Sequence, residues 1–193
     1  MEHFRTFIAL EIKENIKELL ASVQQKIGSK TGGIKWVKPN NLHLTLKFLG
    51  PTPEDKIEDI SAVLEKVAGG LARFNVFVSG LGAFPSINDP KVIWAGLKAD
   101  DVLYKLQKDL DISLESLGFA REKRSFSPHL TIGRVRDNMA KKKLREVFEQ
   151  VRAETGSSKA ENITFYKSDL MPEGPVYTGL KSIQLSNSLQ VEG

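Results

Sequence analysis

The sequence contains no cysteine among its 193 residues. This absence excludes a disulfide scaffold, a thiol nucleophile and any zinc or iron–sulfur site built on thiolates. Long hydrophobic runs are also missing, and none approaches the ~20 apolar residues that a transmembrane helix requires. The first apolar stretch is preceded closely by Arg5 and lacks a small-residue cleavage site, so we expect no signal peptide. We therefore expect a cytoplasmic protein without a membrane anchor.

Neither sign of charge dominates the chain. It carries 28 Lys and Arg against 24 Asp and Glu, a formal net charge of +4, which favours anionic partners only weakly. Hydrophobic residues make up 40% and charged residues 27% of the chain, which argues against disorder. Histidine is scarce, with three residues in all, and two of the three belong to a repeated pattern.

A four-residue pattern occurs twice. His43-Leu44-Thr45-Leu46 returns as His129-Leu130-Thr131-Ile132, 86 residues later (129 − 43). The segment 7–9 matches 93–95 at the same spacing, and hydrophobic periodicity predicts helices over 11–27, 53–67, 100–117 and 137–151. Hairpin-like strand pairs are predicted at 74–78 with 92–95 and at 163–166 with 176–180. The order strand, helix, strand, helix, strand therefore recurs.

This duplication predicts an α+β fold of two lobes related by a pseudo-two-fold axis. We expect two antiparallel sheets that line a central groove, with the helices outside. The whole chain, 1–193, is interpreted as one bilobal domain with repeat halves of roughly 1–90 and 91–193. The terminal strands of the halves are free to be exchanged between the lobes.

In each repeated segment, strand alternation places the histidine and threonine side chains on one face. Residues two apart share a face, so His43, Thr45 and Lys47 point away from the leucines between them, and His129 and Thr131 do the same. With the lobes facing each other, two imidazoles and two hydroxyls would surround one ligand. A histidine on one strand is more often a solvated or structural residue, but the repetition favours a functional pair.

The residue types favour phosphoryl transfer. A metal site is a poor fit because neither segment offers acidic ligands on the same face, so no metal or other cofactor is expected. A serine hydrolase is a poor fit because no G-x-S-x-G elbow occurs. Two imidazoles suit general acid and general base catalysis near neutral pH, and the hydroxyls of Thr45 and Thr131 can donate to phosphate oxygens. The residues alone do not say which histidine is the acid.

The motifs resemble those of a known family. The segments 36–50 and 126–134, supported by 5–9, Phe84-Pro85 and 174–177, are similar to the 2H phosphoesterases, closest to the RNA 2′,3′-cyclic phosphodiesterases once called 2′-5′ RNA ligases. The resemblance implies metal-independent hydrolysis of a terminal 2′,3′-cyclic phosphate on RNA to a 2′-phosphate, with a reverse 2′-5′ joining activity. It implies that His43 is the proton donor and His129 the proton acceptor. Fragments of tRNA are one candidate source of such ends, and we expect a monomer.

Four further residues are candidates for substrate binding. Lys47 shares the face of His43, whereas alternation turns Arg134 away from His129 unless a bulge intervenes. Arg124 lies in a basic loop before the second motif, which is placed to meet RNA phosphates, although such charge runs are usually solvated faces. Phe126 is a candidate for stacking on a base, as are Trp36 and Tyr177, although aromatic residues in strands more often pack in the core.

Two other interpretations stay open. One keeps the chemistry but changes the substrate to a 2′-5′ phosphodiester or a small cyclic nucleotide. The other is a non-catalytic module that binds nucleotides or RNA in the same groove, although binding alone would not require two titratable groups.

Overall fold

The computed structural model describes residues 2–151 and 155–187. Its elements are β1 His3–Glu11, α1 Glu14–Gly28, β2 Ile34–Trp36, η1 Pro39–Asn41, β3 His43–Pro53, η2 Glu54–Lys56, α2 Ile57–Ala68, β4 Asn75–Pro85, β5 Pro90–Ala99, α3 Asp101–Glu115, β6 His129–Val135, α4 Asn138–Gln150, β7 Ser157–Lys159, β8 Asn162–Met171 and β9 Gly174–Gln184. The predicted α+β class with antiparallel strands is confirmed. In this described part of the chain, no helix has the length and apolar character needed to cross a membrane.

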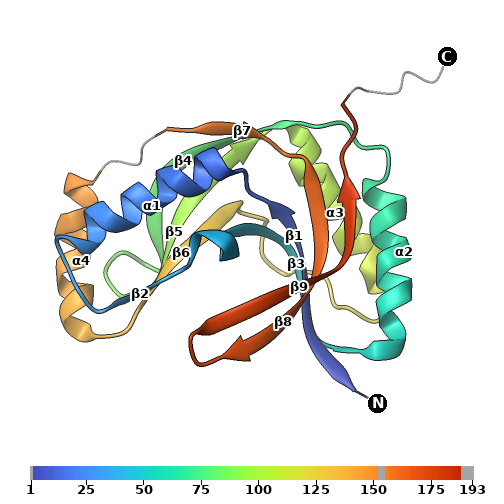
Figure 1. Ribbon diagram of the computed structural model, residues 1–193, viewed down its shortest axis with the longest axis horizontal. Helices are drawn as coiled ribbons and strands as arrows, with labels where there is room; N and C mark the ends of the chain where they lie inside the picture. The colour runs from blue at the N-terminus through green and yellow to red at the C-terminus, as the bar shows by residue number, and fades with distance from the viewer. Residues whose placement is uncertain (1, 152–154, 188–193) are drawn as a thin grey trace.

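The strands of the described residues form one curled sheet of nine strands. Its order is β7-β4-β5-β6-β3-β1-β8-β9, with β2 paired to β6 (Figure 1). The two expected sheets are joined in the middle by a single registered pair, Leu44 of β3 and Leu130 of β6. The separate sheets of the sequence prediction are therefore two halves of one continuous sheet, bent around a groove.

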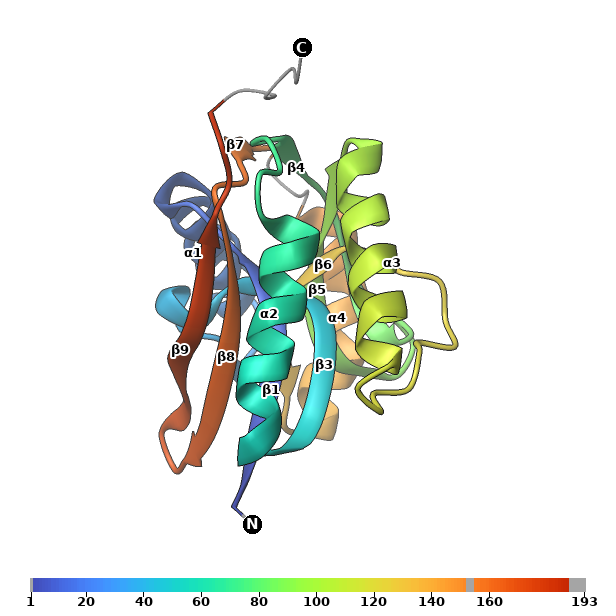
Figure 2. The same ribbon diagram turned by 90° about the vertical axis from the view of Figure 1, so that its right-hand side faces the viewer.

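Each half of the chain places its terminal strands in the opposite lobe. β4 of the first half pairs with β5 of the second half, while β8 of the second half, with β9 beside it, pairs with β1 of the first half. The helices follow the same exchange: α2 and α3 lie side by side against one lobe, and α1 and α4 cover the other (Figures 1 and 2). The fold thus holds the two repeated segments next to each other at its centre.

The register of the first strand corrects one detail of the repeat. In the pairing of β1 with β3, Phe7 lies opposite Phe48, and in the pairing of β5 with β6, Val92 lies opposite Arg134. Because Phe48 and Arg134 are 86 residues apart (134 − 48), Phe7 corresponds to Val92. The predicted match of Phe7 to Ile93 was therefore wrong by one residue.

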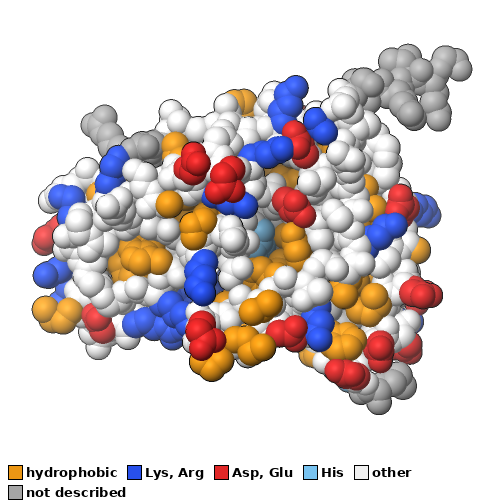
Figure 3. Space-filling model, viewed as in Figure 1, with side chains coloured by type: hydrophobic (Ala, Val, Ile, Leu, Met, Phe, Trp, Pro, Cys, Tyr) orange, Lys and Arg blue, Asp and Glu red, His pale blue; other side chains and the backbone are white. Residues whose placement is uncertain are grey.

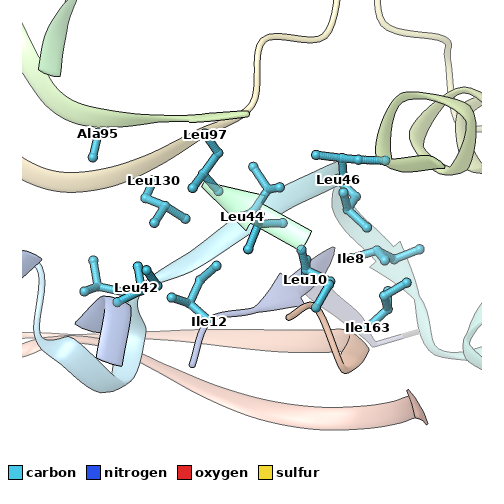
Figure 4. Close-up of a cluster of buried hydrophobic side chains, with 14 of the residues drawn as sticks. Ile8, Leu10, Ile12, Leu42, Leu44, Leu46, Ala95, Leu97, Leu130 and Ile163 are labelled. Atoms are coloured by element: carbon cyan, nitrogen blue, oxygen red, sulfur yellow. The ribbon is translucent and has the colours of Figure 1, made fainter. Parts of the chain in front are cut away.

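The apolar faces of β3 and β6 form the centre of the core. Leu44 and Leu130 are 1% and 0% exposed and lie among Ile8 and Leu10 of β1 (Figure 4). Burying one leucine side chain contributes about 1.5–3 kcal/mol, so the register of both strands is strongly specified. The opposite, polar face of each strand is thereby turned toward the groove.

Candidate active site

A groove of about 640 Å³ lies over the junction of the two halves. Its lining includes His43 and Thr45 of β3 together with His129 and Thr131 of β6. All four flank the Leu44–Leu130 pair in sequence, and alternation places them on the face opposite these leucines. A histidine is visible within the hollow in Figure 3. The structure therefore brings the two predicted histidine–threonine pairs to one site.

Both imidazoles are oriented by the same backbone contact. Nδ1 of His43 lies 2.9 Å from the carbonyl oxygen of Asn41, and Nδ1 of His129 lies 2.7 Å from that of Ser127. A carbonyl only accepts, so Nδ1 carries the proton in each ring. The other nitrogen, Nε2, is left as the one that exchanges protons with a ligand.

The surroundings of the two rings differ. His43 stacks on Phe7, with ring centroids 4.7 Å apart, and meets the edge of Tyr177 at 5.2 Å. Burial lowers the pKa of the His43 imidazole below its ordinary value, and the hydrogen bond to the Asn41 carbonyl opposes this with a smaller effect. His129 meets the edge of Phe84 at 5.0 Å. The two histidines of the pseudo-symmetric site therefore have different surroundings.

A bulge interrupts each catalytic strand at the same place. The pairing of β3 with β1 skips Leu46, and that of β6 with β5 skips Ile132, 86 residues later (132 − 46). One extra residue reverses the alternation beyond it. The bulge in β6 is supported by the buried Gln24, whose amide donates to the Ile132 carbonyl at 2.8 Å.

The reversed alternation corrects the prediction for Lys47. Its side chain is 2% exposed and lies on the helix side of β3, away from the groove. Nζ of Lys47 donates to Oδ1 of Asp111 on α3 at 2.5 Å and to the Ala120 carbonyl at 2.6 Å. Lys47 is therefore part of a buried ion pair, and the structure gives it no contact with a ligand in the groove.

The same reversal turns two other side chains into the groove. Phe48 and Arg134, which follow the two bulges at equivalent positions, both line it. Phe48 is 45% exposed, and the guanidinium of Arg5 lies 4.7 Å from its ring centroid. Sequence reasoning missed Phe48 and Arg5. The bulges could have been suspected from Gly133, where a Cβ would lie 2.9 Å from the Trp36 ring.

Two of the predicted binding residues lie outside the groove lining. Arg124 is exposed on the loop between α3 and β6, and Phe126 packs against the core and against Tyr104, with ring centroids 6.1 Å apart. The structure therefore places neither residue at the groove, because the loop folds toward α3, and a role of either in substrate binding stays a prediction. The other candidates for base stacking, Trp36 and Tyr177, do line the groove.

The groove is rich in positive charge. Five of its lining residues are basic and one is acidic: Arg5, Lys35, Lys38, Arg134, Arg136 and Glu173. Such a surface attracts anions and suits a phosphate ligand. Across residues 2–151 and 155–187, no group of three or more His, Cys, Asp or Glu residues is placed to hold a metal ion.

The comparison with protein families agrees with this geometry. The family described as LigT like Phosphoesterase matches residues 10–94 and 97–177, a span that contains both histidine–threonine segments. The chain belongs to the LigT-like phosphoesterase family. The resemblance predicted from the motifs is thereby confirmed.

Relatives in this family match almost end to end. A Methanocaldococcus jannaschii protein named RNA 2′,3′-cyclic phosphodiesterase is 39% identical over 178 residues, covering 92% of this chain and 98% of the relative. A Thermotoga maritima protein of the same name is 34% identical over 185 residues, covering 96% and 97%.

Solved structures show the same LigT-like fold. A Thermus thermophilus protein superposes with a TM-score of 0.78 and 29% identity, covering 94% of this chain and 97% of the other. Escherichia coli LigT, crystallised with 3′-AMP, superposes with a TM-score of 0.76 and 22% identity, covering 96% and 99%. Because the identity to Escherichia coli LigT is 22%, this similarity is evidence for the fold alone.

Proposed function

We propose that this chain hydrolyses the 2′,3′-cyclic phosphate at the end of an RNA strand, leaving a 2′-phosphate and a free 3′-hydroxyl. The observation that carries the proposal is the pair of imidazoles, each held by a carbonyl two residues earlier, in one cationic groove. The names of the relatives from M. jannaschii and T. maritima support the choice of substrate.

In the proposed reaction the two imidazoles exchange protons with opposite sides of the phosphorus. Nε2 of His129 accepts a proton from water as the water oxygen bonds to phosphorus. The bond from phosphorus to O3′ breaks, and protonated Nε2 of His43 donates its proton to O3′. The Thr45 and Thr131 hydroxyls and Arg134 would stabilise the charge on the non-bridging oxygens. A 5′-hydroxyl in place of water would give a 2′-5′ linkage by the same steps.

Phe48 is the proposed platform for the terminal base. It is exposed in the groove, and Arg5 already covers part of its ring surface. Stacking on an aromatic ring is worth about 1–3 kcal/mol per base and tolerates any base, so this contact would anchor the nucleoside without selecting it. The phosphate would then lie between the histidines.

The first test is turnover of a synthetic RNA that ends in a 2′,3′-cyclic phosphate, in buffer containing EDTA. We expect full conversion to the 2′-phosphate, because the proposed acid and base are both side chains of the protein. Strict dependence on added metal would contradict the mechanism. Tight binding of the same RNA without turnover would instead favour a non-catalytic module.

The pH dependence of kcat/KM tests the role of His43. As the acid, His43 must be protonated, and burial lowers its pKa, so activity should begin to fall at a pH below the ordinary value of about 6.5. Tyr177→Ala exposes the imidazole, raises its pKa and should move this alkaline limb to higher pH. Tyr166→Phe is the control, because Tyr166 contacts Phe7 and not His43. A profile left unchanged by Tyr177→Ala would contradict the titration of His43 in this reaction.

A further inference from the structure

Three cations lie together along one wall of the groove. Lys35 of β2 is the register partner of Arg134 on β6, and Arg136 follows β6 directly. Like charges placed opposite each other on paired strands destabilise a sheet unless an anion lies between or above them. This wall therefore carries more positive charge than one terminal phosphate would use, since Arg134 alone is proposed to contact that phosphate.

Lys35 and Arg136 have no carboxylate partner among the described residues. Within the described part of the chain, the hydrogen bond of the Lys35 ammonium goes to a backbone oxygen, the Pro172 carbonyl at 3.4 Å, which is a weak contact. The Arg136 guanidinium forms no ion pair within residues 2–151 and 155–187. Both side chains are thus available to phosphate oxygens.

The opposite wall is mostly apolar, although it includes the carboxylate of Glu173. The tip of the β8–β9 hairpin exposes Leu170 (71%), Met171 (51%) and Val176 (51%), and all three line the groove. The hairpin is held near η1, because Asn41 donates to the Pro175 carbonyl at 2.8 Å. In Figure 3, basic side chains gather on the β2 side of the hollow and hydrophobic side chains over the hairpin.

We infer that this part of the groove binds the RNA strand upstream of the reacting end, so that the substrate is a single-stranded oligoribonucleotide and not a mononucleotide. The inference rests on the proposed function for the placement of the terminal phosphate. Lys35 and Arg136 contact the next phosphodiester, while Leu170 and Val176 contact the faces of the preceding bases. A single strand is specified because paired bases would hide the faces that an apolar wall contacts.

Equilibrium binding tests the inference without relying on catalysis. The probe is a fluorescently labelled single-stranded RNA that ends in a 2′-phosphate, followed by anisotropy over a range of salt concentrations. Lys35→Gln and Arg136→Gln should each weaken binding about five- to tenfold and lower the salt slope by about 0.7, the value for one lost contact with a single strand. Lys66→Gln, an exposed lysine of α2 outside the groove, is the matched control.

A kinetic comparison separates this subsite from the terminal phosphate site. Lys35→Gln should lower kcat/KM about fivefold more for the cyclic-phosphate oligonucleotide than for a 2′,3′-cyclic mononucleotide. Leu170→Ser should likewise lower kcat/KM more for the oligonucleotide than for the mononucleotide. Ile112→Ser, at an exposed position of α3, should leave the ratio of the two kcat/KM values unchanged.

The outcomes are distinguishable. Equal losses on both substrates would place Lys35 at the terminal phosphate and overturn the inference, as would unchanged RNA binding by both variants or equally tight binding of a duplex end. Absence of turnover by the unsubstituted protein would refute the proposed function, while the anisotropy series would still decide the subsite.

Discussion

Replacing either His43 or His129 with alanine is expected to lower kcat on a cyclic-phosphate RNA by about 10²–10⁴-fold without unfolding the protein. Both rings lie on the polar face of their strands, so their removal leaves the buried leucine face intact. The measurement is single-turnover kinetics together with circular dichroism. His3→Ala is the matched control, because His3 is exposed on β1 and is not part of the groove lining.

A substrate with a better leaving group separates the two roles. If O3′ is replaced by sulfur, the departing thiolate needs no proton, so the loss in His43→Ala should largely disappear while that in His129→Ala remains. Rescue of His129→Ala instead would reverse the assignment. Full activity of either alanine variant on the normal substrate would refute paired histidine catalysis.

The centre of this fold was predictable because two independent signals agree there. The repeat established the equivalence of the two segments, and the alternating leucines identified the buried face of each strand. With Leu44 and Leu130 buried, His43 and His129 had to share the opposite face. Chemistry and packing are encoded in the same few residues, so the prediction needed no knowledge of the rest of the chain.

The prediction failed just beyond this centre, where the alternation reverses. The period-two rule assigned Lys47 to the groove and Arg134 away from it, and one skipped residue in each strand reversed both. A bulge arises from the pairing with a neighbouring strand, which the local sequence does not show. Gly133 was the available hint, since a side chain there would collide with Trp36.

Loop residues were the least predictable. The basic character of the segment 119–128 suggested a contact with phosphate, yet the segment is anchored to α3, where the backbone amide of Glu122 donates to Asp111. The anchor depends on a helix that precedes the loop and on a lysine 64 residues before Asp111 in the chain. Such a long-range arrangement depends on tertiary packing.

Replacing Lys47, the lysine of this buried ion pair, is expected to have a large effect on stability. Lys47→Met should lower the free energy of unfolding by about 3–5 kcal/mol, because it leaves the buried carboxylate of Asp111 without its counter-charge. Urea titration followed by tryptophan fluorescence measures the loss. Lys105→Met is the matched control: Lys105 pairs with Asp109 on the same helix at 2.5 Å, but its side chain is 77% exposed, so we expect a loss of about 0.5 kcal/mol or less.

The double variant Lys47→Met/Asp111→Leu distinguishes charge from packing. Replacing both members with apolar side chains removes the unpaired charge, so most of the stability should return. The loop would still lose the contacts to Ala120 and Glu122, and this loop leads to Ser127, whose carbonyl orients His129. We therefore expect recovered stability with kcat still reduced. A Lys47→Met loss no larger than that of Lys105→Met would show that the buried pair contributes nothing beyond an exposed one.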